Sequence, residues 1–257
     1  MNLIDSHCHL NAKPLAQHID KVISDARAFG IREFIVPGVV ESEWKNLLLL
    51  GSLHSEAYCA AGLHPLFLKQ HHHRDLVKLE NLCQQNLLVA IGEIGLDFYN
   101  GKQQEEEQQH LFEEQLAIAD KVGLPIILHV RKAHDQVLAT LRRKKFTGGG
   151  TVHGYNGSLQ QAEQYIGLGF AIGIGGAITY DRAKKLRNLA TQLPEESIVL
   201  ETDSPDMVIA GKGKGPNLPQ YLVEILHLLA KLRQTTPEQL GETTHLNTHR
   251  VFNITHR

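Results

Sequence analysis

The sequence predicts an α/β protein of the (β/α)8 TIM-barrel class, folded as a single domain over residues 1–257. Short apolar segments alternate eight times with longer amphipathic ones, which is the order that builds a parallel sheet flanked by helices. The apolar segments are continuous rather than alternating, as expected for strands buried on both faces. A doubly wound open sheet is the alternative. We find no internal repeat, low-complexity segment or linker that indicates a second domain.

The predicted strands are short apolar runs that end in glycine, proline or a polar residue. Pro37-Gly38 closes the second strand and Gly175-Gly176 closes the seventh, because these residues favour turns. The sixth strand is a short one that follows three glycines and ends at His153. The other predicted strands span residues 3–9, 31–36, 57–63, 87–94, 124–130, 170–174 and 198–202.

Helices are predicted between the strands from apolar residues at helical spacing. The segment 105–122 is the clearest, with Phe112, Leu116 and Ala119 on one face and Gly123 after its end. Beyond the eighth strand, one helix has Leu222 and Leu226 on its apolar face, and a last one begins at Thr236-Pro237. The remaining predicted helices span 14–29, 43–53, 75–85, 133–144, 158–168 and 182–193.

Composition narrows the class of protein. The chain is 42% hydrophobic and 21% charged, with a formal net charge of −2, so no overall basic field draws it to nucleic acid or anionic lipid. No apolar run approaches the roughly 20 residues of a membrane span, and the N-terminus lacks the pattern of a signal peptide. Three cysteines indicate neither a disulfide framework nor a zinc ribbon. We therefore expect a cytoplasmic protein with no membrane contact and no obligate protein partner.

The first ten residues, MNLIDSHCHL, contain two histidines that are two positions apart. On a strand, His7 and His9 would share one face with Asp5. Two imidazoles on one face can converge on a metal ion. An isolated His-x-His pair can instead be two histidines that each make an ordinary hydrogen bond. Whether the rest of the chain brings further ligands to the same place decides between this alternative and a metal site.

The carboxyl ends of the other predicted strands supply those ligands. Active sites of (β/α)8 barrels lie at this end of the strands, and chance is a poor explanation for so many ligand-type residues on five strands of one barrel. The residues that we expect to bind metal there are His7, His9, Glu93, His129, His153 and Asp203.

This mixture of imidazole and carboxylate suits one or two divalent ions, with zinc, manganese and magnesium all compatible. Glu93 lies between the strand of His7 and His9 and the strands of His129 and His153, so we expect its carboxylate to bridge two ions about 3.5–4 Å apart. Asp203 is expected to bind the first ion and to accept a proton from the attacking water. Glu93 and Asp203 are therefore the predicted catalytic residues.

Six motifs, in order, resemble those of the TatD-type metal-dependent hydrolases. They span nearly the whole chain: SHCHL at 6–10, GLHP at 62–65, GEIGLD at 92–97, LHVRKA at 128–133, HGYNG at 153–157 and ETDSP at 201–205. Residues 247–254 are also similar to the C-terminal helix of the family.

The resemblance implies a TIM barrel of the amidohydrolase superfamily, the same six metal ligands and, often, deoxyribonuclease activity. Two segments depart from the family pattern. HGYNG stands at 153–157 where the family usually has His-Cys-Phe-x-Gly, and Asn217-Leu218-Pro219 follows Gly-Pro where it usually has Arg-Asn-Glu-Pro. Both departures concern the substrate side and leave the metal ligands intact.

Four residues are candidates for binding substrate, each with a structural alternative. His64 could hydrogen-bond a phosphate or orient its loop, and Arg131 could pair with a phosphate oxygen or form a surface salt bridge. Tyr155 could stack on a base or pack against its loop. Lys212, in the glycine-rich segment 211–215, could hold a phosphate backbone, although flexibility explains the glycines equally well.

We therefore expect a metal-dependent hydrolase of ester bonds, a deoxyribonuclease that shortens single-stranded DNA from an end, with DNA or another phosphate ester as its partner. The alternative is a metallohydrolase of a small-molecule ester, amide, lactone or phosphate, which the net charge and the altered motifs favour somewhat. A purely structural metal site is disfavoured, because it would not need Asp203.

Overall fold

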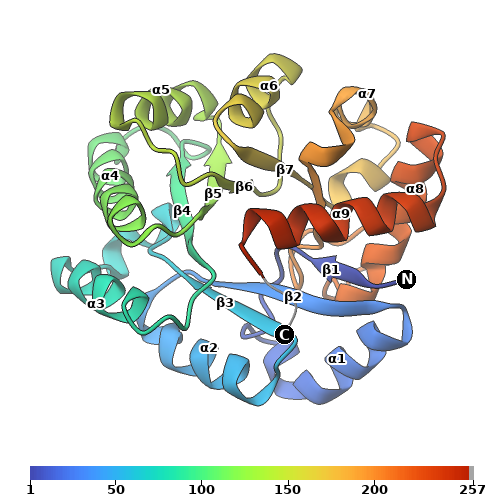
Figure 1. Ribbon diagram of the computed structural model, residues 1–257, viewed down its shortest axis with the longest axis horizontal. Helices are drawn as coiled ribbons and strands as arrows, with labels where there is room; N and C mark the ends of the chain where they lie inside the picture. Colours follow the sequence, from blue (N-terminus) through green and yellow to red (C-terminus); the bar gives the residue numbers. More distant parts are fainter. Residues whose placement is uncertain (255–257) are drawn as a thin grey trace.

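A computed structural model describes residues 1–254 as one barrel of eight parallel strands, each paired with the next along the chain (Figure 1). Residues 255–257 of the predicted domain lie outside the described residues. The amide of Ser6 donates to the carbonyl of Leu200 over 2.9 Å, so the last strand lies beside the first and the barrel is nearly closed. The (β/α)8 prediction is confirmed and the open-sheet alternative is wrong. The strands are β1 (Leu3–Asp5), β2 (Ile31–Gly38), β3 (Ala57–Ala61), β4 (Ala90–Asp97), β5 (Ile126–Arg131), β6 (Gly150–Val152), β7 (Phe170–Ile174) and β8 (Ile198–Leu200).

Helices surround the barrel. They are α1 (Ile19–Ala28), α2 (Glu41–Leu53), α3 (His73–Cys83), α4 (Glu105–Val122), α5 (His134–Lys144), α6 (Leu159–Gly167), α7 (Lys184–Gln192), α8 (Leu222–Arg233) and α9 (Pro237–Val251). Short 3₁₀ helices add η1 (Leu15–His18), η2 (Pro65–Gln70), η3 (Gly176–Thr179), η4 (Glu195–Ser197) and η5 (Pro219–Tyr221). The α4 helix ends where Gly123 adopts a left-handed conformation. Within residues 1–254, none of the helices has the length and apolar character needed to cross a bilayer.

Apolar side chains fill the amino end of the barrel. Residues from seven strands, among them Ile4, Ile35 and Ile127, pack with Val251 and Phe252 in one buried cluster. The α9 helix that brings these last two residues crosses the barrel in Figure 1. This apolar packing closes the amino end, and the predicted metal ligands follow the strands at the opposite, carboxyl end.

Several strand boundaries differ from those predicted, and those of β1, β4 and β8 affect the position of the predicted ligands. β1 ends at Asp5 rather than residue 9, because the Asp5 carboxylate turns to accept hydrogen bonds from the amide and hydroxyl of Thr202 (2.9 and 2.6 Å). β8 likewise ends at Leu200, before Thr202. β4 begins at Ala90 and continues past Glu93 to Asp97, with an irregular register against β5 between Ile91 and Ile94. His7, His9 and Asp203 therefore lie in loops, whereas Glu93 lies within a strand.

Candidate metal centre

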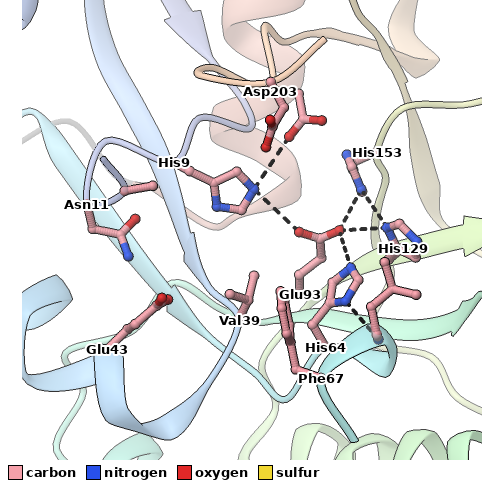
Figure 2. A pocket seen from close by; sticks show the side chains of 13 residues that line it. His9, Asn11, Val39, Glu43, His64, Phe67, Glu93, His129, His153 and Asp203 are labelled. Atoms are coloured by element: carbon pink, nitrogen blue, oxygen red, sulfur yellow. Dashed lines mark hydrogen bonds and ion pairs between the residues drawn. The ribbon is translucent and has the colours of Figure 1, made fainter. Parts of the chain in front are cut away.

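The carboxyl end of the barrel brings all six predicted metal ligands together. Figure 2 shows Glu93 at the middle of this group, facing His9 on one side and His129 and His153 on the other. The ligands come from the loop after β1, from β4 and β5, and from the loops after β6 and β8: His7, His9, Glu93, His129, His153 and Asp203.

Four ligand atoms form a first set around one point. Nε2 of His7 lies 3.3 Å from both Nε2 of His9 and Oε2 of Glu93, and 3.5 Å from Oδ1 of Asp203. Nε2 of His9 lies 3.6 Å from the same Glu93 oxygen and 3.4 Å from the same Asp203 oxygen. Corners of a tetrahedron with bonds of about 2.1 Å are about 3.4 Å apart. The spacing of this set therefore matches that of a metal coordination shell.

The other oxygen of Glu93 faces a second set. Oε1 lies 2.6 Å from Nε2 of His153 and 2.9 Å from Nδ1 of His129, and these two nitrogens are 3.2 Å apart. Neighbouring ligands in an octahedron with bonds of about 2.1 Å are about 3.0 Å apart. The donor atoms of the two sets thus fit two divalent ions with Glu93 between them, and the 2.6 Å contact between Glu93 and His153 is a direct hydrogen bond in the metal-free protein.

Hydrogen bonds on the far side of two rings fix which nitrogen is free to bind metal. Nε2 of His129 donates to Oδ2 of Asp97 over 2.9 Å, which leaves the Nδ1 lone pair for the second set. Nδ1 of His9 lies 3.3 Å from the carbonyl of Pro37, which leaves Nε2 for the first set. Metal-binding histidines usually donate their other N–H in this way. Sequence reasoning assigned Asp97 no role, although it ends the GEIGLD motif.

His64 has the opposite arrangement. Its Nδ1 accepts the amide of Leu66 (3.1 Å), so the proton of the neutral ring is on Nε2, which lies 3.3 Å from Oε1 of Glu93. His64 therefore donates a hydrogen bond to Glu93 and has no lone pair for a metal. Its bond to Leu66 caps η2, as the loop-orienting alternative predicted.

Burial and neighbouring charges shift the pKa values of the ligands. Burial raises the pKa of Glu93, but His153, His64 and His7 outweigh it and hold that pKa well below its usual range. Burial lowers the pKa of His153, yet the Glu93 carboxylate raises it to about 10. Burial lowers the pKa of His7 to about 4. In the metal-free protein, a proton on His153 therefore supplies positive charge that a bound cation would otherwise supply.

Glu201 supports the loop of His153 and was not predicted to have a role. It is buried, and its Oε1 accepts the amide of Gly154 at 2.5 Å. Burial raises the pKa of Glu201 to about 8. The residue is part of the ETDSP motif, but its contact with Gly154 joins segments 47 positions apart, which no local pattern reveals.

Two hollows open from the ligand cluster and share His129, His153 and Asp203. The acidic hollow, of about 350 Å³, is lined by Asn11, Glu43, Phe67 and Asp206 beside the ligands. Figure 2 labels the first three of these residues. The basic hollow, of about 540 Å³, is lined on the other side by Tyr99, Arg131, Lys132 and Met207. Both volumes are in the range of small-molecule sites, so a substrate can lie on both sides of the ligands.

Arg131 lies in the wall of the basic hollow, as its predicted substrate role requires. Its guanidinium carbon stands 3.6 Å from the ring centre of Tyr99, and Nζ of Lys132 stands 4.6 Å from the same centre. No salt bridge of Arg131 is formed within residues 1–254. The ring and the two cations form a positively charged, partly aromatic wall beside the ligands. Sequence reasoning missed Tyr99 and Lys132.

The other two predicted substrate-binding residues make contacts within the protein, Tyr155 in the wall of the basic hollow and Lys212 outside both hollows. Tyr155 is only 2% exposed, and its hydroxyl donates to the carbonyl of Ser158 over 2.6 Å, so its ring packs into the wall as the structural alternative predicted. Lys212 pairs with Glu224 at 2.5 Å and lies over the ring of Tyr221, outside both hollows. A carboxylate on α8 draws this lysine away from the site.

Comparison with known proteins shows the family of this chain. Residues 4–253 match the model of the family described as TatD related DNase. The chain is 38% identical to the uncharacterized metal-dependent hydrolase YjjV of Escherichia coli (strain K12), over 98% of each chain. It is 31% identical to the 3'-5' ssDNA/RNA exonuclease TatD of Erwinia amylovora, over 98% of this chain and all of that one.

Solved structures give the same result for the fold. The crystal structure of the E. coli K12 TatD homologue YjjV matches with a TM-score of 0.95 at 37% identity, covering 98% of each chain. A TatD-family hydrolase from Entamoeba histolytica matches with a TM-score of 0.86 at 21% identity, covering 99% of each chain. The second match supports the barrel alone.

Proposed function

The chain belongs to the TatD related DNase family of metal-dependent hydrolases, and from that membership we propose that it hydrolyses phosphodiester bonds at the 3' end of single-stranded DNA. His7, His9, Glu93 and Asp203 would hold one divalent ion, and Glu93, His129 and His153 a second. The ions would be zinc, manganese or magnesium.

The position of Glu93 supports this proposal most directly. Its two carboxylate oxygens face two separate sets of ligand atoms, Oε2 toward His7 and Oε1 toward His153, each at 3.3 Å or less. A structural metal site has no use for a second, adjoining set of ligands or for open space beside it. A two-ion hydrolytic centre needs both.

When bound, a pair of divalent ions lowers the pKa of a water and stabilises charge on the entering and leaving oxygens. Asp203 accepts the proton of the attacking water, since its carboxylate borders both hollows and neighbouring histidines outweigh burial to hold its pKa low. A bond forms between that water oxygen and phosphorus, and the bond from phosphorus to the 3' oxygen of the strand breaks, so that this oxygen leaves with the electron pair and takes a proton from solvent to become a 3'-hydroxyl. His64 holds Glu93 in place by its Nε2–H bond.

The choice of DNA is supported by the Erwinia relative, named a 3'-5' ssDNA/RNA exonuclease, and by Arg131 and Lys132 beside the ligands. A second candidate is the phosphate ester of a small molecule. Glu43 and Asp206 favour it, because the hollow that they line would repel a long polyanion.

Digestion of a 5'-labelled single-stranded oligonucleotide tests the proposal. Purified protein is incubated with the oligonucleotide and added magnesium, manganese or zinc, beside an Asp203→Asn variant and a chelated sample. We expect metal-dependent shortening from the 3' end that is lost in both controls. If metal is bound but no oligonucleotide is shortened, the DNA assignment is wrong, and panels of small phosphate esters decide on the second candidate.

A further inference from the structure

The two hollows beside the ligands carry opposite charges. Apart from metal ligands and His64, the ionisable residues of the acidic hollow are Glu43 and Asp206, and no lysine or arginine lines it. The basic hollow contains Arg131 and Lys132, and its only carboxylate is the ligand Asp203. The charge along a substrate that crosses the ligand cluster must therefore change from one side to the other.

Their apolar surfaces also differ. In the acidic hollow, Val39, Leu66 and Phe67 form an uncharged wall, and Figure 2 shows Glu43 and Asn11 at the side away from His129. In the basic hollow, Tyr99 is 50% exposed and holds both cations against its ring. A base can stack on an aromatic ring on either side, but phosphates are accommodated only where the cations are.

We propose that this charge difference makes the enzyme act at strand ends: the phosphate-rich strand lies in the basic hollow, and the terminal nucleoside lies in the acidic hollow. This inference rests on the proposed function. Glu43 and Asp206 then exclude any substrate that carries another phosphate beyond the terminal nucleoside. Internal bonds of a strand and ends that carry a phosphate are both excluded by the same repulsion.

Like charges a few ångströms apart in a partly desolvated hollow repel by enough to change a rate at least about tenfold. The repulsion must also weaken as salt screens it. Both properties can be measured without knowledge of the physiological substrate.

The experiment compares two oligonucleotides of one sequence that end in a 3'-hydroxyl or a 3'-phosphate, at pH 8 with saturating Mn²⁺. The wild type is expected to hydrolyse the hydroxyl-ended strand at least about tenfold faster. In a Glu43→Gln/Asp206→Asn double variant, the ratio of the two rates should fall to about two or less. Glu242→Gln, which removes an exposed carboxylate from α9, should keep the wild-type rates and ratio.

Equal rates for the two ends in the wild type, or an unchanged ratio in the double variant, would overturn the inference and leave the nuclease assignment intact. If no DNA is hydrolysed at all, the proposed function fails and this inference fails with it. Should the double variant not fold, the wild-type ratio is measured between 0.05 and 0.5 M salt. A ratio that falls with salt supports the repulsion, and a constant ratio contradicts it.

Discussion

Oδ2 of Asp97 lies 2.9 Å from Nε2 of His129, on the opposite side of the ring from Glu93. The carboxylate is itself fixed, since its Oδ1 accepts the amide of Tyr99 over 2.8 Å. Asp97 and Glu93 both come from β4, so one strand supplies a ligand and the group that orients a second ligand on β5. This carboxylate–histidine pair is the arrangement that makes an imidazole a stronger metal donor.

Replacing Asp97 with asparagine should weaken the second ion site. The neutral amide can still accept the N–H of His129, but it no longer raises the basicity of the ring, so we expect metal affinity or activity to fall about 10- to 100-fold. Metal affinity is measured by titration with Mn²⁺, beside Asp25→Asn on the exposed face of α1 as the control. Wild-type affinity in Asp97→Asn would mean that the pair only positions the loop.

Metal binding should release a proton from His153. Its folded-state pKa is raised to about 10 by Glu93 despite burial, so at pH 8 the ring of the metal-free protein is protonated, and an ion can bind only the neutral form. Affinity should therefore increase as pH rises toward about 10 and weaken as pH falls. His7, with a pKa of about 4, is already neutral at pH 8 and contributes no proton.

Calorimetric titration with Mn²⁺ at pH 8 in two buffers of different ionisation enthalpy measures this proton. In the wild type, the difference in binding enthalpy divided by the difference in buffer ionisation enthalpy should give about one proton released per chain. His153→Gln should release fewer protons. A heat that does not depend on the buffer would contradict the assignment of the charge to His153.

Two glycine-to-alanine substitutions should have opposite effects on stability. At Gly150 (φ +141°), a Cβ atom would overlap the carbonyl oxygen of Ile126 on β5, so alanine should lower the free energy of unfolding by about 3 kcal/mol. At Gly167, the exposed last residue of α6, nothing lies within 4 Å, and alanine should raise it by up to about 1 kcal/mol. Urea unfolding of the two metal-free variants measures both free energies of unfolding. Equal changes in the two variants would contradict the close pairing of β5 and β6 at Gly150.

The barrel and the ligand cluster were predictable because they depend on local patterns with a fixed consequence. Eight buried strands in parallel bring their carboxyl ends to one rim, so a histidine that follows a strand lies near others that do the same. Even with β1 ending at Asp5 rather than residue 9, His7 and His9 keep their Nε2 atoms 3.3 Å apart. The position of Glu93 between the two sets of ligand atoms followed from strand order alone.

Residues that act through a partner were not predictable in the same way. The role of Asp97 depends on the rotamer of His129, and that of Glu201 on a contact with Gly154 across two strands. Lys212 was expected near the site because its loop follows β8, but pairing with Glu224 depends on where α8 begins. Tyr99 and Lys132 follow the paired ends of β4 and β5, but the contact between their side chains depends on packing that no local pattern reveals.

We propose that Glu93 joins two ion sites into one catalytic centre. Titration of metal-free protein with Mn²⁺, following bound metal and hydrolysis of a 5'-labelled oligonucleotide in the same samples, tests it most directly. We predict that hydrolysis reaches its plateau at two ions per chain, and that Glu93→Gln binds fewer ions and shows no hydrolysis at any Mn²⁺ concentration. Full activity with one ion per chain, or an active Glu93→Gln variant, would contradict the claim.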